Sequence, residues 1–442
     1  FFYFVFSSGG GTQDNNTFAD YPTLGVDATA VYVGVNVFNS ALTQYLGSTG
    51  FVIRKSSLTG GGPIVYTAFR RIVNGNSNGP YAPAGPDNED PNASEGYFVG
   101  VDKALFGRVT MRRITDPGGT PVISGNLFVT VPTTTNAYAP PCQGSSHPLS
   151  AVDDRHFNAM IHLNRITGQR TLWMGHHFQV NASGQASGSG GRSGARWYEI
   201  QNLTTTPVLR QAGTLYSTAT SNPANYIFPG LAMSGQGHMA IATTVCGTTE
   251  HAEIAVAGRL NDDPNGSTQA PTVAQTTSAA YNSGLQGTSY RWGDYSFTGV
   301  DPVDDMTIWT AQEYCNSTDS WGIRIIQLKA PPAATAASCN PATVTQGAAN
   351  VDVVVTGTST SGSGFYDTDA SYTNRLAVTV GGTGVTVNGL TWASPTQFTM
   401  NVSVDPNAAT TARIITVTNP DGQTVASASG ILTIAAPPAN CP

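Results

Sequence analysis

Short apolar runs alternate with polar turns along most of this chain. Four segments look alike: each has an apolar strand, a turn with Asp, Gly or Asn, and an aromatic-rich apolar strand. These segments are residues 21–38, 154–178, 226–245 and 292–314, and residues 97–114 belong to a further unit of the same kind. A strand–turn–strand unit is a β-hairpin. Weakly similar hairpins repeated along a chain indicate blades stacked around an axis.

The repeats predict a β-propeller over residues 1–328 with about five blades and an incomplete first blade at the N-terminus. The first six residues, FFYFVF, are all apolar. A run this short is too brief for a membrane span or for the apolar core of a signal peptide. We expect it to be a buried strand that the sequence enters midway.

The pattern changes after the propeller. Residues 329–338 (KAPPAATAAS) are rich in Pro and Ala without apolar periodicity, as in a linker. Short alternating strands then follow at regular spacing, which predicts an Ig-like sandwich over residues 339–436 and a tail over 437–442. The predicted fold class is therefore all-β, with a multi-blade propeller followed by a β-sandwich.

Composition supports this fold and narrows the partners. Apolar residues make up 40% of the 442 residues and charged residues 11%, with a net charge of −7. The chain has enough apolar residues for a large core, and no basic tract that would attract nucleic acid. It has no apolar run of 18 residues, so we expect no membrane span. We expect a secreted or cell-surface protein.

Five cysteines are scattered without the paired spacing of a zinc or haem site. In a chain of this composition they suggest disulfides in an oxidising compartment. We expect the pairs Cys246–Cys315, between neighbouring blades, and Cys339–Cys441, across the ends of the last domain. Cys142 is then left over, and its fate stays open.

Several motifs resemble a known group. The stretches DYPTLGVDATAVYV, DDRHFNAMIHLN and RWGDYSFTGVDPVDDMTIWTAQEY resemble, in the same order, a largely uncharacterised group of secreted bacterial β-propeller proteins. The stretches CNPATVTQGAANVDVVVTG and VTVNGLTWASPTQFTMNVSV resemble IPT/TIG Ig-like domains. These resemblances imply a fold, secretion and a spacer or interaction module, but no chemistry. The long segment 358–375 is a candidate contact surface.

Candidate chemistry is sparse. Asp301, Asp304 and Asp305 could bind calcium through carboxylate oxygens, or could simply cap a hairpin turn. Calcium is the one cofactor that the sequence suggests. His176 and His177 are adjacent on a strand and point to opposite faces, so they cannot readily share a metal. The more economical interpretation is that both histidines are structural.

Four other residues are predicted to build the blades. Asp20 and Asp294 hold equivalent places in the repeats, which favours a hydrogen bond to a neighbouring blade over a catalytic role. Arg196 and Arg291 each precede a tryptophan, and we expect them to stack on or pair beside blade aromatics.

These observations favour an extracellular non-catalytic scaffold protein of the cell surface, the matrix or a filament, which assembles with further copies of itself. The first alternative is an adhesin that binds a surface glycan or a protein. The second alternative is a propeller-type glycoside hydrolase or lyase, which requires two carboxylates facing one central pocket.

Overall fold

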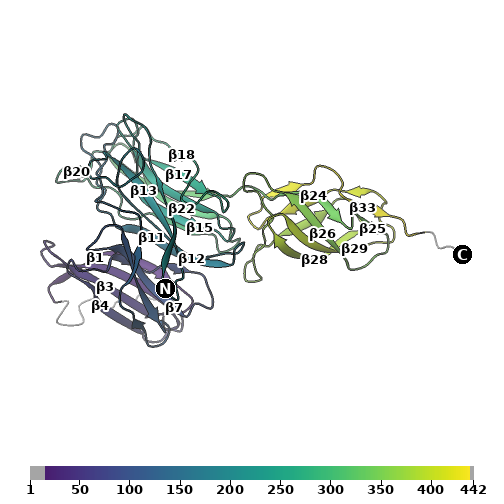
Figure 1. Cartoon of the computed structure of the whole chain (residues 1–442), viewed down its shortest axis with the longest axis horizontal. Helices are drawn as coiled ribbons and strands as arrows, with labels where there is room; N and C mark the ends of the chain where they lie inside the picture. The colour runs from purple at the N-terminus through teal and green to yellow at the C-terminus, as the bar shows by residue number, and fades with distance from the viewer. Residues whose placement is uncertain (1–14, 439–442) are drawn as a thin grey trace.

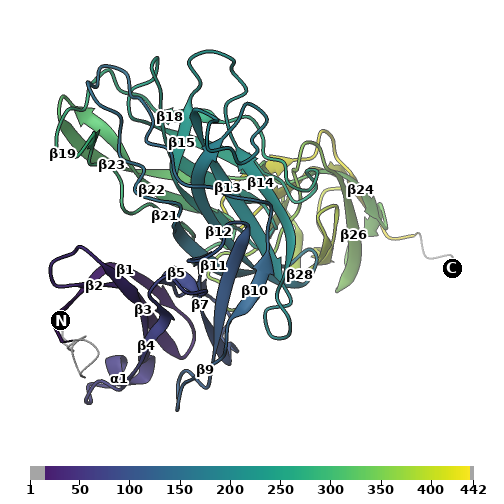
Figure 2. The same cartoon turned by 60° about the vertical axis from the view of Figure 1, so that its left-hand side comes forward.

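The computed structural model describes residues 15–438, and almost all of its regular structure is strand (Figures 1 and 2). One short helix, α1 (Lys55–Thr59), lies in this described part. The predicted all-β fold class is confirmed. The segment FFYFVF lies outside the described residues. No helix within residues 15–438 has the length and apolar character needed to cross a membrane.

Five sheets follow one another along the propeller, and their strands are antiparallel apart from one pair. The first sheet contains β1 (Thr17–Val26), β2 (Ala30–Asn39), β3 (Tyr45–Arg54) and β4 (Tyr66–Asn74). The second contains β5 (Pro80–Ala84), β7 (Glu95–Asp102), β8 (Arg108–Thr115), β9 (Val122–Ile123) and β10 (Leu127–Thr130). The third contains β11 (His156–Asn164), β12 (Gln169–Val180), β13 (Arg192–Gln201) and β14 (Val208–Leu215), with β6 (Asp87–Asn88) added parallel to β11.

The last two sheets complete this part of the molecule. The fourth contains β15 (Asn225–Met233), β16 (Met239–Cys246), β17 (Glu253–Arg259) and β18 (Thr272–Gln275). The fifth contains β21 (Phe297–Val300), β22 (Ile308–Ser317) and β23 (Ser320–Leu328), preceded by the short pair β19 (Leu285–Gln286) and β20 (Ser289–Tyr290).

All five expected hairpins are present, as the pairs β1–β2, β7–β8, β11–β12, β15–β16 and β21–β22. The expected incomplete first blade is wrong, because the first sheet has four strands. The sheet with three described strands is instead the fifth. Local alternation of apolar and polar residues reveals hairpins, but it does not show which sheet a further strand joins.

Three of the inner strands share one irregularity. A register shift interrupts β1, β5 and β15. In each strand the residue before a proline has a positive φ: Tyr21 (51°), Ala82 (46°) and Phe228 (53°). Such bulges bend a strand and re-aim its side chains. Glycine then allows close approach, since a Cβ on Gly25 would lie 2.0 Å from the carbonyl oxygen of Gly85 in the next blade.

The core lies between neighbouring blades. Hydrophobic clusters join the second sheet to the third, and the third to the fourth and fifth. In one cluster Trp173 and Trp197 stack with ring centroids 5.7 Å apart. Among the clusters of the described residues, none joins the first sheet to the fifth. Those two sheets meet where Tyr21 stacks on Tyr295, with ring centroids 5.0 Å apart.

The C-terminal unit is a second all-β body that extends from one end of the propeller (Figure 1). Its first sheet contains β24 (Thr335–Asn340), β26 (Val351–Thr358), β28 (Val385–Ser394) and β29 (Gln397–Val404). Two smaller sheets contain β25 (Thr343–Thr345), β30 (Ala412–Arg413) and β33 (Leu432–Ala435), and β27 (Ala377–Val380), β31 (Ile415–Thr418) and β32 (Thr424–Ala426). One hydrophobic cluster fills the space between the sheets. The specific IPT/TIG-like assignment stays a prediction.

The predicted linker is shorter than expected and is fixed to the C-terminal unit. Its last residues belong to β24, which begins at Thr335. Lys329 Nζ donates a hydrogen bond to the carbonyl of Asp421 at 2.6 Å, and Gln423 donates to the carbonyl of Ala330 at 2.8 Å. These contacts hold the C-terminal unit close to the end of the propeller.

Candidate functional site

A cleft of about 850 Å³ opens at the centre of the propeller. Its walls come from β1, β6, β11 and β21, which belong to the first, third and fifth sheets, and from Ser371 and Tyr372 of the C-terminal unit. Because inner strands from separate sheets converge on it, the cleft is the natural ligand site of this fold.

Five acidic side chains line this cleft: Asp27, Asp87, Glu89, Asp90 and Asp301. Of the lining side chains that the structure describes, Lys55 alone is basic. The cleft therefore repels anionic ligands and suits neutral or cationic ones.

Three of these acids are committed to structural contacts. Asp27 accepts hydrogen bonds from the backbone of Thr29 and Ala30, each at 2.7 Å, as the cap of its turn. Asp90 forms an ion pair with Arg170 at 3.2 Å. Asp301 bonds to its own hairpin. Its Oδ1 accepts a hydrogen bond from the backbone N–H of residue 303 at 2.9 Å, and its Oδ2 accepts one from the indole of residue 309 at 2.9 Å.

Asp87 and Glu89 are the remaining pair. They are two residues apart at the end of β6, which pairs parallel to β11 and so lies at the centre of the propeller. Residues two apart in extended chain lie on one face, with Cα atoms about 6.5 Å from each other. This spacing lets both carboxyl groups face one bound ligand.

The two carboxyl groups have different environments. Burial raises the pKa of Asp87 to about 6, the charge of Glu89 adds to the rise, and a hydrogen bond of 3.0 Å from the backbone N–H of Val26 opposes it. Glu89 is more exposed, and its Oε2 lies 3.4 Å from His162 Nδ1. Asp87 therefore keeps its proton to a higher pH than an ordinary aspartate, as a general acid requires.

Aromatic side chains flank the acids. Phe297 is 55% exposed and Trp309 is 38% exposed, and both line the cleft together with Tyr372. Exposed aromatic rings beside polar groups suit the apolar face and the hydroxyls of a sugar ring.

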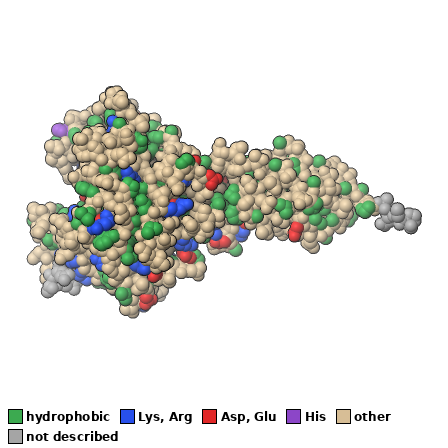
Figure 3. Space-filling view, in the orientation of Figure 1, with side chains coloured by type: hydrophobic (Ala, Val, Ile, Leu, Met, Phe, Trp, Pro, Cys, Tyr) green, Lys and Arg blue, Asp and Glu red, His purple; other side chains and the backbone are tan. Residues whose placement is uncertain are grey.

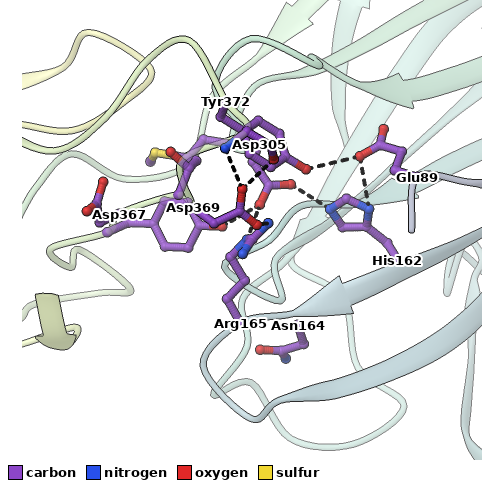
Figure 4. A network of polar contacts seen from close by, with 12 residues as sticks. Glu89, His162, Asn164, Arg165, Asp305, Asp367, Asp369 and Tyr372 are labelled. Atoms are coloured by element: carbon purple, nitrogen blue, oxygen red, sulfur yellow. Dashed lines mark hydrogen bonds and ion pairs between the residues drawn. The ribbon is translucent and has the colours of Figure 1, made fainter. Parts of the chain in front are cut away.

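Behind the cleft lies a network of ion pairs centred on Asp305 (Figure 4). Asp305 Oδ1 lies 2.6 Å from His162 Nε2, and its Oδ2 accepts from Arg165 Nε at 2.7 Å and from the Tyr366 hydroxyl at 2.6 Å. Burial would raise the pKa of Asp305, but the hydrogen bonds, that from His162 foremost, outweigh burial and hold the pKa below its usual value. Asp305 is thus a buried anchor that joins three segments of the chain.

The same network brings ligand atoms of Glu89, His162 and Asp305 within 4.8 Å of one another. His162, however, faces Asp305 with one ring nitrogen and Glu89 with the other. This geometry describes a histidine held between two carboxylates, and a cation at this place would take one of its two ring nitrogens.

The predicted calcium residues do not form one oxygen cage around a common point. Asp304 caps its own turn, because its Oδ1 accepts from the backbone N–H groups of Met306 at 2.9 Å and Thr307 at 2.8 Å. Asp305 points instead into the network with His162, and Asp301 belongs to the cleft wall. Calcium binding by this trio stays a prediction.

The histidines of the third blade are buried and bonded. His177 Nε2 lies 2.9 Å from the carbonyl of Ala151, and its Nδ1 accepts from the backbone N–H of Phe228 at 3.0 Å. His176 lies 2.7 Å from the carbonyl of Asp154. Burial lowers the pKa of His176 to about 3 and that of His177 to about 4, so both rings are neutral at physiological pH.

Of the four predicted blade-building residues, three gather away from the acidic cleft. Asp20, Arg291 and Asp294 line a smaller cavity of about 280 Å³ at the opposite end of β1. Asp294 accepts a hydrogen bond from Arg291 instead of bonding to a neighbouring blade. Arg196 lies over the ring of Phe178, 5.2 Å from its centroid.

The predicted Cys246–Cys315 disulfide is wrong, because both residues carry free, buried thiols. Cys142 and Cys339 are free and buried as well, and Cys441 lies outside the described residues. Cys142, Cys246 and Cys315 all belong to one hydrophobic cluster. In this structure they act as small apolar core residues.

Comparison with known proteins gives matches in solved structures alone. No family model matches the chain, and no curated protein matches it. The GH43_1 enzyme from Xanthomonas citri complexed with xylose shares 11% identity and a TM-score of 0.35, covering 70% of this chain and 87% of its own. A thermostable family-43 glycoside hydrolase shares 14% identity and a TM-score of 0.33, covering 72% and 91%. A subtype N11 neuraminidase-like protein of A/flat-faced bat/Peru shares 11% identity and a TM-score of 0.32, covering 96% and 90%.

The cleft corrects the main functional prediction, a non-catalytic scaffold, in favour of its second alternative. The alternative of a propeller-type glycoside hydrolase required paired acids in a central pocket, and the cleft contains them.

Sequence reasoning missed Asp87, Glu89 and Tyr372. The stretch GPDNED, residues 85–90, holds three acids directly after the apolar segment PYAPA. A short acidic stretch rich in Gly, Pro and Asn is equally typical of a surface loop, so the sequence alone does not single it out. No local signal places Tyr372 beside Glu89, because the two residues come from different structural units.

Proposed function

We propose that this protein is a glycoside hydrolase that cleaves a neutral oligosaccharide or polysaccharide in the central cleft. The observation that carries the proposal is the pair Asp87 and Glu89, two residues apart in the chain, whose side chains both line a cleft that also holds aromatic rings. The faint likeness to known hydrolases takes no part in this argument.

The two carboxyl groups have distinct roles. Asp87 is the general acid, since a pKa of about 6 keeps a useful protonated fraction near neutral pH. It donates its proton to the glycosidic oxygen while the bond from that oxygen to the anomeric carbon breaks. Glu89 either takes a proton from the water that attacks this carbon, or attacks the carbon itself and is released later by water.

The charge of the cleft narrows the substrate class. A lyase acting on uronic acids, or a sialidase, must bind a substrate carboxylate with cationic side chains. The described lining offers Lys55 against five acids. Arg155 and Arg291 line the cavity at the opposite end of β1. A neutral glycan avoids the repulsion that an anionic glycan would meet.

The test is hydrolysis of a panel of neutral oligosaccharides, with xylotriose included, beside one uronic-acid oligomer and one sialoside. We expect cleavage of at least one neutral member, lost by 10²–10⁴-fold in Asp87→Asn and in Glu89→Gln. Asp352→Asn makes the same chemical change at an exposed site of the C-terminal unit and should keep full activity.

Two outcomes contradict the proposal. One is the absence of cleavage across the whole neutral panel. The other is a cleavage activity that survives both cleft substitutions. Binding of a glycan without turnover, abolished by the same substitutions, would identify a carbohydrate-binding protein instead.

A further inference from the structure

The C-terminal unit is more than an appendage of the propeller. Its segment 366–375 reaches back over the end of the inner strands, where Figure 4 shows it beside Asp305 and Glu89. Tyr366 donates its hydroxyl to the buried Asp305 at 2.6 Å, and Asn374 donates its backbone N–H to the carbonyl of Val303 at 3.0 Å. The sequence predicted a contact surface in this region, and the segment contacts the propeller itself.

Arg165 fixes the segment from the propeller side. Its guanidinium pairs with Asp305 at 2.7 Å and with Asp369 at 2.8 Å, and it lies 5.2 Å from the centroid of the Tyr372 ring. The pair with Asp305 is buried, whereas Asp369 is half-exposed, so its pair with Arg165 contributes little by itself. The hydrogen bond from Tyr366 to the buried Asp305 is therefore the stronger anchor of the segment.

Tyr372 is the residue that this arrangement delivers to the cleft. Its ring lines the cleft with Ser371, and its hydroxyl donates to Glu89 Oε2 at 3.3 Å. Figure 4 shows it between the network and the exposed carboxylate. A ring in this place offers a stacking face to a sugar, and its hydroxyl bonds to one of the two acids.

We propose that segment 366–375 forms one wall of the substrate cleft and that Tyr372 is a specificity-determining residue that contacts the glycan. This inference rests on the proposed hydrolase function. It adds that the site is composite, with the acids on the propeller and one sugar-binding wall on the C-terminal unit. Tyr366 and Arg165 are positioning residues that act through this wall.

The experiment compares Tyr372→Ala with Tyr372→Phe in the full chain, using the neutral oligosaccharide that the wild type cleaves best. We expect the alanine variant to raise KM by about 10–100-fold, since aromatic contacts of this kind contribute mainly to binding. Loss of the hydroxyl contact to Glu89 should change kcat to the same extent in the alanine and the phenylalanine variants. The phenylalanine variant keeps the ring and should restore KM to within about 3-fold. Phe128→Ala is the matched control. Phe128 is an exposed ring on β10, the edge strand of the second sheet, and its removal should leave KM and kcat unchanged.

A second arm separates this inference from the proposed hydrolysis. In the Asp87→Asn background, calorimetric titration with the same oligosaccharide measures Kd without turnover. Adding Tyr372→Ala should weaken Kd by the factor seen in KM. Normal cleavage with unchanged KM and Kd in the alanine variant would overturn the composite site and leave the hydrolase function standing. A fall in thermal stability without a change in either constant would show a purely structural tyrosine, and a wild type that neither binds nor cleaves any glycan would overturn both proposals.

Discussion

Replacing Asp87 by Asn should inactivate the protein and stabilise it above pH 6. Burial raises the pKa of this carboxyl from 3.8 to about 6, so ionisation of Asp87 at neutral pH lowers the free energy of unfolding. Each pKa unit corresponds to about 1.4 kcal/mol, which gives about 3 kcal/mol as the upper limit at pH 7.5. Because the side chain still reaches solvent, we expect about 1–2 kcal/mol.

The sign of the pH dependence follows from the direction of this shift. A carboxyl with a raised pKa binds its proton more tightly in the folded state, so the penalty is complete above pH 6 and disappears as pH falls toward 3.8. At pH 4.5 the stabilisation by Asn should fall to about a third of its value at pH 7.5. Asn retains an oxygen that can accept the hydrogen bond from the backbone of Val26.

The assay is thermal unfolding of wild type, Asp87→Asn and Asp352→Asn at pH 7.5 and pH 4.5. We expect Asp87→Asn to raise Tm by roughly 1–3 °C at pH 7.5 and by much less at pH 4.5. The exposed Asp352 provides the control and should show no such pH dependence. A variant that is less stable than wild type at pH 7.5, or whose gain is the same at both pH values, would refute the assignment of Asp87 as a strained acid.

Three further predictions test the fold and the buried groups. His177→Phe removes the acceptor of the Phe228 backbone N–H and should lower the free energy of unfolding by about 2–4 kcal/mol, measured with a denaturant. A loss below about 0.5 kcal/mol would contradict a structural role for this imidazole. Gly25→Ala should destabilise the protein by about 3 kcal/mol or more, because the new Cβ would lie 2.0 Å from the carbonyl oxygen of Gly85. Gly389 has open space around it, so Gly389→Ala is the control and should have little effect. Equal effects of the two substitutions would argue against close contact of the first two blades. Because the described cysteines are free, a thiol reductant should leave Tm unchanged, and a clear fall would reveal a disulfide.

The low charge of the chain has a visible consequence for the surface. On the face shown in Figure 3, Lys, Arg, Asp and Glu are scarce over the C-terminal unit and more frequent over the propeller and at the junction between the two. At this junction Asp305 pairs with His162 and Arg165, and Arg165 pairs with Asp369.

Local sequence patterns are enough to predict the strands, the hairpins and the change of pattern near residue 329. These features depend on apolar alternation and turn residues over ten to twenty positions, so they are local and can be recognised without knowing the fold. For the same reason the histidines at 176 and 177 could be assigned a structural role from their opposite orientation on one strand.

The acidic cleft depends on contacts between distant parts of the chain. Asp87, Asp301 and Tyr372 are far apart in the chain, and they meet because inner strands of separate sheets converge and a segment of the C-terminal unit folds back over them. Position in a repeat does not show whether an acid belongs to the cleft. Asp20 and Asp294 hold equivalent repeat positions, but both line the cavity at the opposite end of β1 from the acidic cleft. Burial and the proximity of distant charges set which acid holds its proton, and neither quantity exists until the sheets have closed around the axis.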